Sequence, residues 1–113
     1  MLSKSFRFSL RTENARLKKE GKKFYSPLFS IVYIVQSDKT INHPRFSVLL
    51  SKKISRKATV RNKIKRIIYD AAREIILKSK SPIDILIIPN PKIISIDKNI
   101  VKNEIIKALN III

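Results

Sequence analysis

Residues 51 to 66 read SKKISRKATVRNKIKR and concentrate positive charge in one short stretch of the chain. Eight of them are Lys or Arg, and neither Asp nor Glu occurs between residues 51 and 69. Ammonium and guanidinium groups bind phosphate oxygens, and Asn62 adds an amide among the cations. The chemistry that these residue types favour is the binding of a polyanion.

The whole chain shares this charge. Among 113 residues, 25 are Lys or Arg and 8 are Asp or Glu, which gives a formal net charge of +17. A compact body with that charge repels itself, and such an excess is usually retained because a polyanion neutralises it. Nucleic acid is the first candidate partner, and an anionic membrane surface is the second.

Several kinds of catalytic chemistry are missing from the sequence. Cysteine is absent, which excludes disulfides, thiolate metal sites and cysteine nucleophiles. Gly21 is the only glycine, so a glycine-rich phosphate loop is also excluded. His43 is the only histidine and lies in a predicted turn, where a histidine is usually a simple surface residue. No two carboxylates have a spacing that suits acid–base chemistry. We expect no catalytic residue on this chain.

The length and the apolar content predict one domain over residues 1–113, with a single core. The first residues, MLSKSFRFSLRT, contain no continuous apolar stretch that would suit a secretory signal. No apolar run approaches the roughly 18 residues that span a bilayer. We expect a soluble cytoplasmic protein without membrane contact.

The first half of the chain predicts one helix and two strands. Thr12 suits an N-cap and Gly21 a C-terminal stop, so residues 13–20 predict a short helix. Residues 24–36 are rich in β-branched and aromatic side chains and predict a strand, whose start Pro27 places at an edge or bulge. After a turn at 37–44, alternation predicts a half-buried strand at 45–52.

The second half changes to a helical period. Residues 57–79 predict a long amphipathic helix, residues 83–88 a strand covered on both faces, and Asp97 caps a last helix. The order is therefore α-β-β-α-β-α. It predicts an α+β fold, a two-layer sandwich with the long helix packed on a small sheet.

A helical wheel separates two sides of the long helix. The apolar stripe consists of Val60, Ile64, Ile67, Ile68, Ala71 and Ile75. The opposite, polar side consists of Asn62, Lys65, Arg66, Tyr69 and Arg73. Most charged helix faces are simply solvated, and that interpretation remains the alternative here.

Two features favour an anion-binding surface over a solvated face. Solvated helices usually mix acids and bases at i,i+4 spacing, and residues 51–69 hold no acid. The charge order also opposes the helix dipole, because four cations lie at the positive end: Lys52, Lys53, Arg56 and Lys57. A phosphate at the helix start would reverse that penalty. Composition does not decide between DNA and RNA.

The pairs Lys52-Lys53 and Lys57-Ala58 are followed by the run Arg61-Asn62-Lys63-Ile64-Lys65-Arg66. This pattern resembles the signature of the bacterial ribonuclease P protein subunit, whose long helix carries an Arg-Asn-Arg core, a hydrophobic residue and Lys-Arg. The resemblance covers about residues 5 to 110. It includes the helix that ends at Gly21, the basic and aromatic strand that follows it, and the segment IDILIIPNP.

The resemblance implies a fold and an activity. The fold is an α-β sandwich with a left-handed β-α-β crossover, which general rules of handedness disfavour, and a domain of a small-subunit ribosomal protein shares it. The activity is that of a ribonucleoprotein endoribonuclease whose catalyst is RNA. The protein binds the catalytic RNA, strengthens binding of Mg²⁺ held mainly by that RNA, and grips the 5′ leader of precursor tRNA. Nothing in the sequence indicates an obligate protein partner.

The resemblance and the charge of the stretch together imply two groups of binding residues. Those expected to face the catalytic RNA are Lys52, Lys53, Arg56, Lys57, Arg61, Asn62, Lys63, Lys65, Arg66, Tyr69 and Arg73. Those expected in a leader-binding cleft between the N-terminal helix and the sheet are Phe24, Tyr25, Phe29, Tyr33 and Lys18. For each aromatic residue, a place in the core is an equal alternative. Metal ligands, including any near Asn62, stay open.

The sequence departs from the family pattern in three places. Lys63 replaces the second Arg of the core, which keeps the charge and loses bidentate phosphate geometry. Tyr69 occupies a position where an Arg is common in the family. Its contact with the RNA is therefore either stacking of the ring or absent. Asn14 and Lys18 occupy positions of the N-terminal helix where aromatic residues are expected, so the leader grip here relies more on charge.

Three other classes of protein share some of these features. A ribosomal RNA-binding protein with a similar sandwich fits the charge and the fold, and lacks the helix motif. A nuclease acting alone would need clusters of carboxylates or histidines, which the sequence does not show. A membrane-surface protein would need a free apolar helix face, and here that face is expected to pack on the sheet.

Overall fold

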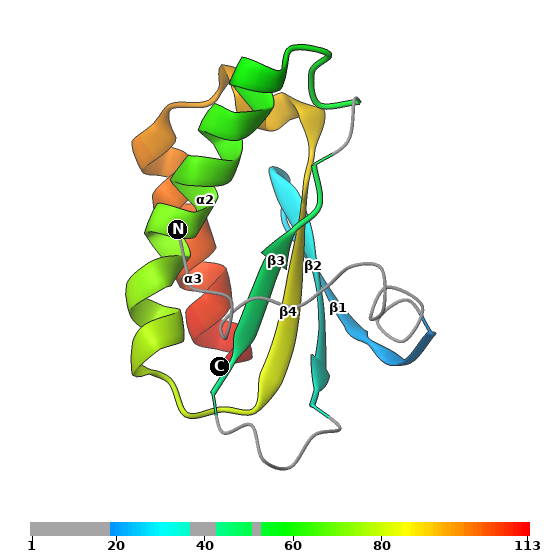
Figure 1. The fold of residues 1–113 in the computed structure, drawn as a ribbon, viewed down its shortest axis with the longest axis vertical. Helices are drawn as coiled ribbons and strands as arrows, with labels where there is room; N and C mark the ends of the chain where they lie inside the picture. Colours follow the sequence, from blue (N-terminus) through cyan, green and yellow to red (C-terminus); the bar gives the residue numbers. More distant parts are fainter. Residues whose placement is uncertain (1–18, 37–42, 51–52) are drawn as a thin grey trace.

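The computed structural model describes residues 19–36, 43–50 and 53–113 of the chain (Figure 1). Its strands are β1 (Lys22–Tyr25), β2 (Phe29–Val35), β3 (Arg45–Val48) and β4 (Ile83–Pro89). Its helices are α2 (Ala58–Lys78), the short 3₁₀ helix η2 (Pro91–Ser95) and α3 (Lys98–Ile112). The predicted long helix, the strand at 83–88 and the last helix are confirmed. The predicted helix at 13–20 lies outside the described residues except for its last two, which are helical.

The strands form one mixed sheet in the order β1-β2-β4-β3. The pairs β1–β2 and β2–β4 are antiparallel, and the pair β3–β4 is parallel. Parallel neighbours need a crossover connection, and α2 supplies it between β3 and β4.

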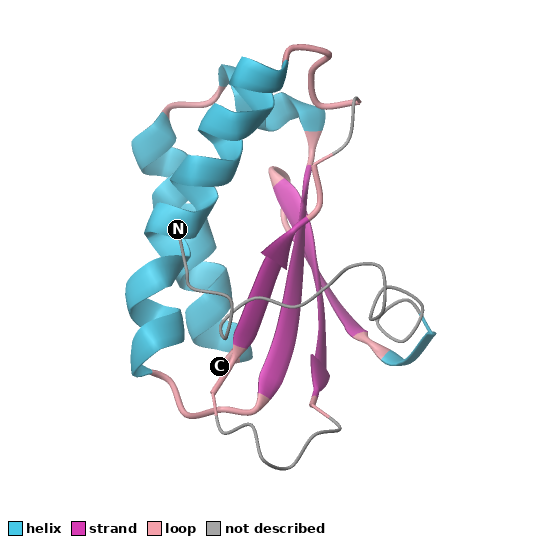
Figure 2. Cartoon of the chain, in the orientation of Figure 1, coloured by secondary structure: helices cyan, strands magenta, loops and turns pink. Residues whose placement is uncertain are grey.

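The molecule has two layers (Figure 2). Helices α2 and α3 cover one face of the sheet, and no helix within the described residues covers the other face. The predicted α+β fold, with the long helix packed on the sheet, is confirmed at this level. When an amphipathic helix packs on a sheet with one apolar face, the apolar sides of both are removed from water.

The prediction of one strand over residues 24–36 is wrong. The segment forms an antiparallel hairpin, and Pro27 lies in the turn between β1 and β2. The Ser26 N–H donates to the Phe29 carbonyl (2.9 Å) and closes this turn. Pro27 has no N–H for a ladder, which explains why strand pairing is interrupted there. The expected edge position is correct, because β1 is the edge strand.

Strand β4 occupies the interior of the sheet and is covered on both faces, as predicted. Ile85 and Ile87 point into the core between the sheet and the helices, whereas Leu86 packs with Val32 on the opposite face. The continuous apolar run IDILII thus reflects burial on both sides. Strand β3 is shorter than predicted and ends at Val48, while residues 51 and 52 lie outside the described part of the chain.

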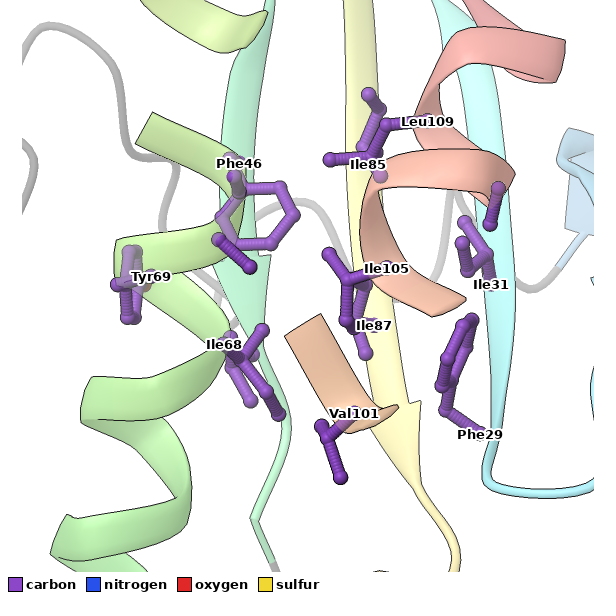
Figure 3. Packing of buried hydrophobic residues seen from close by; sticks show 14 of the residues in the cluster. Phe29, Ile31, Phe46, Ile68, Tyr69, Ile85, Ile87, Val101, Ile105 and Leu109 are labelled. Atoms are coloured by element: carbon purple, nitrogen blue, oxygen red, sulfur yellow. The ribbon is translucent and has the colours of Figure 1, made fainter. Parts of the chain in front are cut away.

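The core lies between the sheet and both helices (Figure 3). Its fully buried members are the following side chains: Phe29, Ile31, Phe46, Ile68, Ile76, Ile85, Ile87, Ile105 and Leu109. Helix α3 begins with the predicted cap, because an oxygen of the Asp97 carboxylate accepts a hydrogen bond from the Asn99 N–H (2.7 Å). This packing fixes the orientation of α2 and therefore decides which of its cations face outward.

Candidate nucleic-acid interface

The loop before α2 is tied to the helix that follows it. The Ser55 hydroxyl accepts a hydrogen bond from the Lys57 N–H (3.1 Å). The Ser55 carbonyl oxygen accepts another from Nη1 of Arg61, one turn into α2 (2.8 Å). Arg61 is half-buried as a result, and its guanidinium acts on the loop conformation as well as carrying charge.

The start of α2 is strongly electropositive. Its N-cap residue, Lys57, makes no side-chain cap, and the first turn contains no acid. Lys53, Arg56 and Lys57 are exposed around this end of the helix. We call these three residues the N-terminal cluster. Cations, free amides and the positive helix end all point toward the same region, which is the arrangement that attracts an anion.

One side of α2 continues this charge along the helix. Asn62, Arg66 and Arg73 are exposed, and Lys65 is half-buried beside them. We call these four residues the basic face. They extend over three turns, or about 16 Å at 1.5 Å per residue.

The cations of this region are not matched by acids. Within the part of the chain that the structure describes, the following side chains form no ion pair: Arg56, Lys57, Lys63, Lys65, Arg66 and Arg73. The nearest acids in sequence, Asp70 and Glu74, are exposed on the flank of α2 that also carries Lys63. The basic face and the N-terminal cluster therefore carry charge that an external anion can neutralise.

Lys63 does not belong to the basic face. Around the helix axis it lies about 100° from Asn62 and about 160° from Lys65. It lines a groove that α2 forms with η2 and the beginning of α3. The sequence motif keeps Asn62 and Lys63 adjacent along the chain, while the helix directs them to different surfaces.

The prediction that Tyr69 lies on the polar side of α2 is wrong. Tyr69 is only 4% exposed, and its ring packs edge-on against Phe46 of β3 with centroids 5.3 Å apart and an interplanar angle of 80°. The buried arc of α2 is wider than the predicted stripe, because α2 contacts α3 as well as the sheet, and it also includes Ala72 and Ile76. Tyr69 is therefore a core residue.

The four aromatic residues predicted for a leader cleft do not share one surface. Phe29 is 1% exposed and lies in the core, so its predicted contact with a leader is wrong. Phe24 and Tyr33 are half-buried and pack against the same core from the helix side of the sheet. Tyr25 is 74% exposed, and its pairing with Ser30 directs it to the opposite face.

Lys23 was missed by the sequence reasoning. It is exposed and pairs with Val32, whose side chain packs on the sheet face opposite α2 and α3. Because side chains alternate along a strand, Lys23 and Tyr25 project from the same face. The two-residue spacing between Lys23 and Tyr25 was the feature of the sequence that could have predicted this shared face. Lys18 and Lys52 lie outside the described residues.

The described residues offer no protein metal centre. No group of three or more His, Asp or Glu side chains comes together among residues 19–36, 43–50 and 53–113. Nor is any helix in this part of the chain long and apolar enough to cross a membrane.

These features define an α+β protein that presents a basic helix face suited to nucleic-acid binding. The family model described as Ribonuclease P matches residues 2–112. The chain belongs to the ribonuclease P protein family.

Curated relatives agree with this membership. The ribonuclease P protein component of Thermoanaerobacter sp. (strain X514) is 30% identical over 108 residues, which cover 88% of this chain and 90% of the relative. The corresponding protein of Rickettsia bellii (strain RML369-C) is 33% identical over 98 residues and covers 82% of each chain.

Solved structures have the same fold. The RNase P protein from Thermotoga maritima superimposes with a TM-score of 0.79 at 25% identity, covering 91% of this chain and 94% of that one. An RNase P protein mutant from Staphylococcus aureus gives a TM-score of 0.84 at 25% identity, covering 96% of this chain and 88% of that one. The chain is thus a subunit of the ribonuclease P ribonucleoprotein enzyme, which functions in tRNA 5′ maturation, and its family implies an RNA subunit as partner.

Proposed function

We propose that this chain binds the catalytic RNA of ribonuclease P through the N-terminal cluster and the basic face of α2. The observation that carries the proposal is the start of α2, where the first turn has no acid, no side-chain cap is made, and Lys53, Arg56 and Lys57 are exposed. Arg56 and Lys57 form no ion pair within the described residues, and such cations at a helix N-terminus each cost about 0.3–1 kcal/mol. RNA phosphates at this end turn that cost into a stabilising interaction.

The two groups of cations have different roles in this proposal. The N-terminal cluster binds phosphates at the end of the helix, together with free amides. The basic face extends the contact, with Arg66 and Arg73 binding phosphates and Asn62 donating from its amide to RNA acceptors. Because the major groove of A-form RNA is narrow, such a helix recognises the shape of the RNA backbone rather than its sequence. Lys52, which lies outside the described residues, is proposed as a further RNA-binding cation on the strength of the sequence motif.

We propose that the 5′ leader of precursor tRNA lies along the sheet face opposite the helices. Tyr25 provides an exposed ring on which an unpaired base stacks, and Lys23 binds a neighbouring phosphate. Stacking of this kind contributes about 1–3 kcal/mol per base. Phe24 and Tyr33 support the strands that carry this surface, and Lys18 adds charge from the N-terminal segment.

Mg²⁺ and the cleavage chemistry belong to the RNA in this proposal. The described residues bring no group of acids or histidines together for a metal ion, so no catalytic step is assigned to the chain. The cations of α2 reduce repulsion between RNA phosphates, which lowers the Mg²⁺ concentration that the RNA needs.

The connection from β3 through α2 to β4 is proposed to be left-handed, as in the family that the sequence resembles. Supporting this, β3 and β4 are adjacent and parallel, so one helix crossing joins them. A crystal structure of the chain bound to ribonuclease P RNA would test the hand directly.

The test is reconstitution with a bacterial ribonuclease P RNA and a precursor tRNA at low Mg²⁺. The chain is expected to stimulate cleavage at the mature 5′ end, and the chain alone is expected to be inactive. Binding to the RNA without stimulation would instead favour a ribosomal or other RNA-binding role. Cleavage by the isolated chain would overturn the assignment of catalysis to the RNA.

A further inference from the structure

A groove runs along the flank of α2 that faces away from Lys65. It lies between the first half of α2, the 3₁₀ helix η2 and the first turn of α3, and it encloses about 530 Å³. Pockets of roughly 300–1,000 Å³ hold small ligands, so this groove has room for one nucleotide.

Most residues that line the groove are aliphatic, and we call Val60, Ile67 and Ile94 its floor. Val60 and Ile67 line it from α2, where both side chains are half-buried, and Ile94 lines it from η2. Ile94 is 48% exposed, although isoleucine is among the residues most often buried. Apolar side chains open to solvent in a concave surface favour a flat apolar group, such as a nucleobase.

The rim of the groove is cationic. Lys63 from α2 and Lys98 from α3 both line it and are both exposed. Neither forms an ion pair within the described part of the chain. The one acid in the lining is Asp97, which caps α3 by accepting from the Asn99 N–H (2.7 Å) and is therefore engaged with its own helix.

We propose that this groove receives one unpaired nucleotide of the ribonuclease P RNA. The base lies on the floor of Val60, Ile67 and Ile94, and its phosphate lies between Lys63 and Lys98. An aliphatic floor with two cations at its rim is complementary in charge and polarity to a nucleotide, which has a flat base and an anionic phosphate. This inference rests on the proposed function, because it requires the RNA to be bound along α2.

Continuity with the basic face supports this occupant over a free small molecule. Arg66 of the basic face follows Lys63 by three residues on α2, and residues at that spacing are neighbours on a helix surface, so RNA bound along the basic face passes near the groove. Lys63 then has a role separate from that of Arg66. The Lys63 ammonium binds a phosphate at the groove, and the Arg66 guanidinium binds a different phosphate on the basic face.

The first experiment measures RNA affinity with substitutions at exposed groove positions. Ile94→Glu places a negative charge on the floor, and Lys98→Ala removes one cation from the rim. We expect Ile94→Glu to weaken binding of ribonuclease P RNA by about tenfold or more, because it places a carboxylate against the anionic RNA. We expect Lys98→Ala to reduce the salt dependence by about one phosphate contact.

The matched control is Lys80→Ala, which makes the same charge change in the exposed segment after the C-terminal end of α2. It is expected to keep the parent salt dependence. Thermal unfolding of each variant establishes that it is folded. If Ile94→Glu fails to fold, Lys98→Ala and the thiol experiment below still decide the question. A Lys98→Ala slope equal to that of the parent would overturn the proposal.

The second experiment uses the absence of cysteine from the chain. A single thiol is introduced by Ile94→Cys in the groove, Lys57→Cys in the N-terminal cluster or Lys80→Cys as the exposed control. The rate of alkylation by iodoacetamide is measured with and without saturating ribonuclease P RNA. The thiols at positions 94 and 57 are expected to be protected by the RNA, and that at position 80 is expected to react at its free rate.

The two thiols separate the two proposals. Protection at position 57 without protection at position 94 would overturn the groove and leave the proposed function intact. Failure of the RNA to protect either thiol would contradict RNA binding along α2 itself.

Discussion

Arg61 donates a hydrogen bond of 2.8 Å from its Nη1 atom to the carbonyl oxygen of Ser55, and so connects the first turns of α2 to the loop before it. The same serine accepts from the Lys57 N–H through its hydroxyl (3.1 Å). Both bonds hold the segment that carries Arg56 and Lys57 against the start of the helix. One member of the family motif thus positions the other cations of the interface.

Replacement of Arg61 by Ala is expected to loosen this loop. A hydrogen bond from a charged donor contributes about 1.5–3 kcal/mol, so the amides of residues 53–57 should exchange with solvent faster in the free protein. Hydrogen exchange followed by NMR measures the effect. Arg66→Ala removes the same charge and has no bond to the loop, and is the matched control. Equal exchange in the two variants would show that Arg61 does not restrain the loop.

Arg66→Ala is expected to weaken binding of ribonuclease P RNA without changing the stability of the protein. Arg66 is exposed and makes no ion pair within the described residues, so its loss removes only an external contact. The plot of log K against log salt should become shallower by about 0.7–0.9, the contribution of one phosphate. Titrations at several salt concentrations measure this slope. An unchanged slope would remove Arg66 from the interface.

Arg45→Ala is expected to destabilise the fold strongly. Nε and Nη2 of Arg45 donate to the two carboxylate oxygens of Asp84 (2.7 and 2.8 Å), and Asp84 is fully buried. Removing the guanidinium leaves a buried carboxylate without its cation, which costs about 3–5 kcal/mol. Urea unfolding measures the change.

The control for Arg45 is Lys107→Ala. Lys107 lies 3.9 Å from Glu104 in an exposed pair, and such pairs contribute about 0.2–1 kcal/mol. Replacement of both Arg45 and Asp84 by apolar residues of similar size should recover most of the stability, because no buried charge then remains. A double variant no more stable than Arg45→Ala would contradict this explanation.

Tyr69→Ala is expected to lower the free energy of unfolding by about 3–5 kcal/mol, as for other large core residues. Tyr69→Phe retains the edge-on contact with Phe46 and should leave RNA affinity at the parent value. Urea unfolding and RNA titration on both variants measure these effects. If Tyr69→Phe lost RNA affinity at unchanged stability, the hydroxyl group would belong to the interface.

Tyr25→Ala is expected to reduce discrimination between precursor and mature tRNA. The ring is exposed on the sheet face opposite α2 and α3, so its removal should cost leader binding about 1–3 kcal/mol and leave folding unchanged. The measured quantity is the ratio of the affinities of the reconstituted enzyme for tRNA with and without a leader. Phe29→Leu is the contrasting variant, which should lower stability and keep this ratio.

The arrangement of the second half of the chain followed from local patterns. The period of residues 57–79 predicted α2, the run IDILII predicted a strand covered on both faces, and Asp97 predicted the cap of α3. These features depend on neighbouring residues and on caps, which a sequence displays directly. The hairpin at Pro27 was misread as one strand, because the residues on either side of the turn have the same strand-forming character.

The outward or inward orientation of individual residues depended on which elements pack together. A wheel treats α2 as having one apolar side, but α2 packs on β3 as well as on α3. Tyr69 contacts Phe46 of β3 and therefore lies in the core. The same packing turns Lys63 toward η2 and α3 and away from the basic face.

The sequence by itself determined the positive charge, the basic helix and the motif that identifies the family. These properties are carried by residue types and their spacing, and no distant contact is needed to specify them. Only the tertiary structure decided that Arg61 holds the loop at Ser55 and that Lys63 lines a groove. It also decided that Tyr25 is the exposed ring among the four aromatic residues predicted for the leader cleft. Each of these outcomes depends on how separate elements pack, because burial of apolar surface selects the face that each side chain presents.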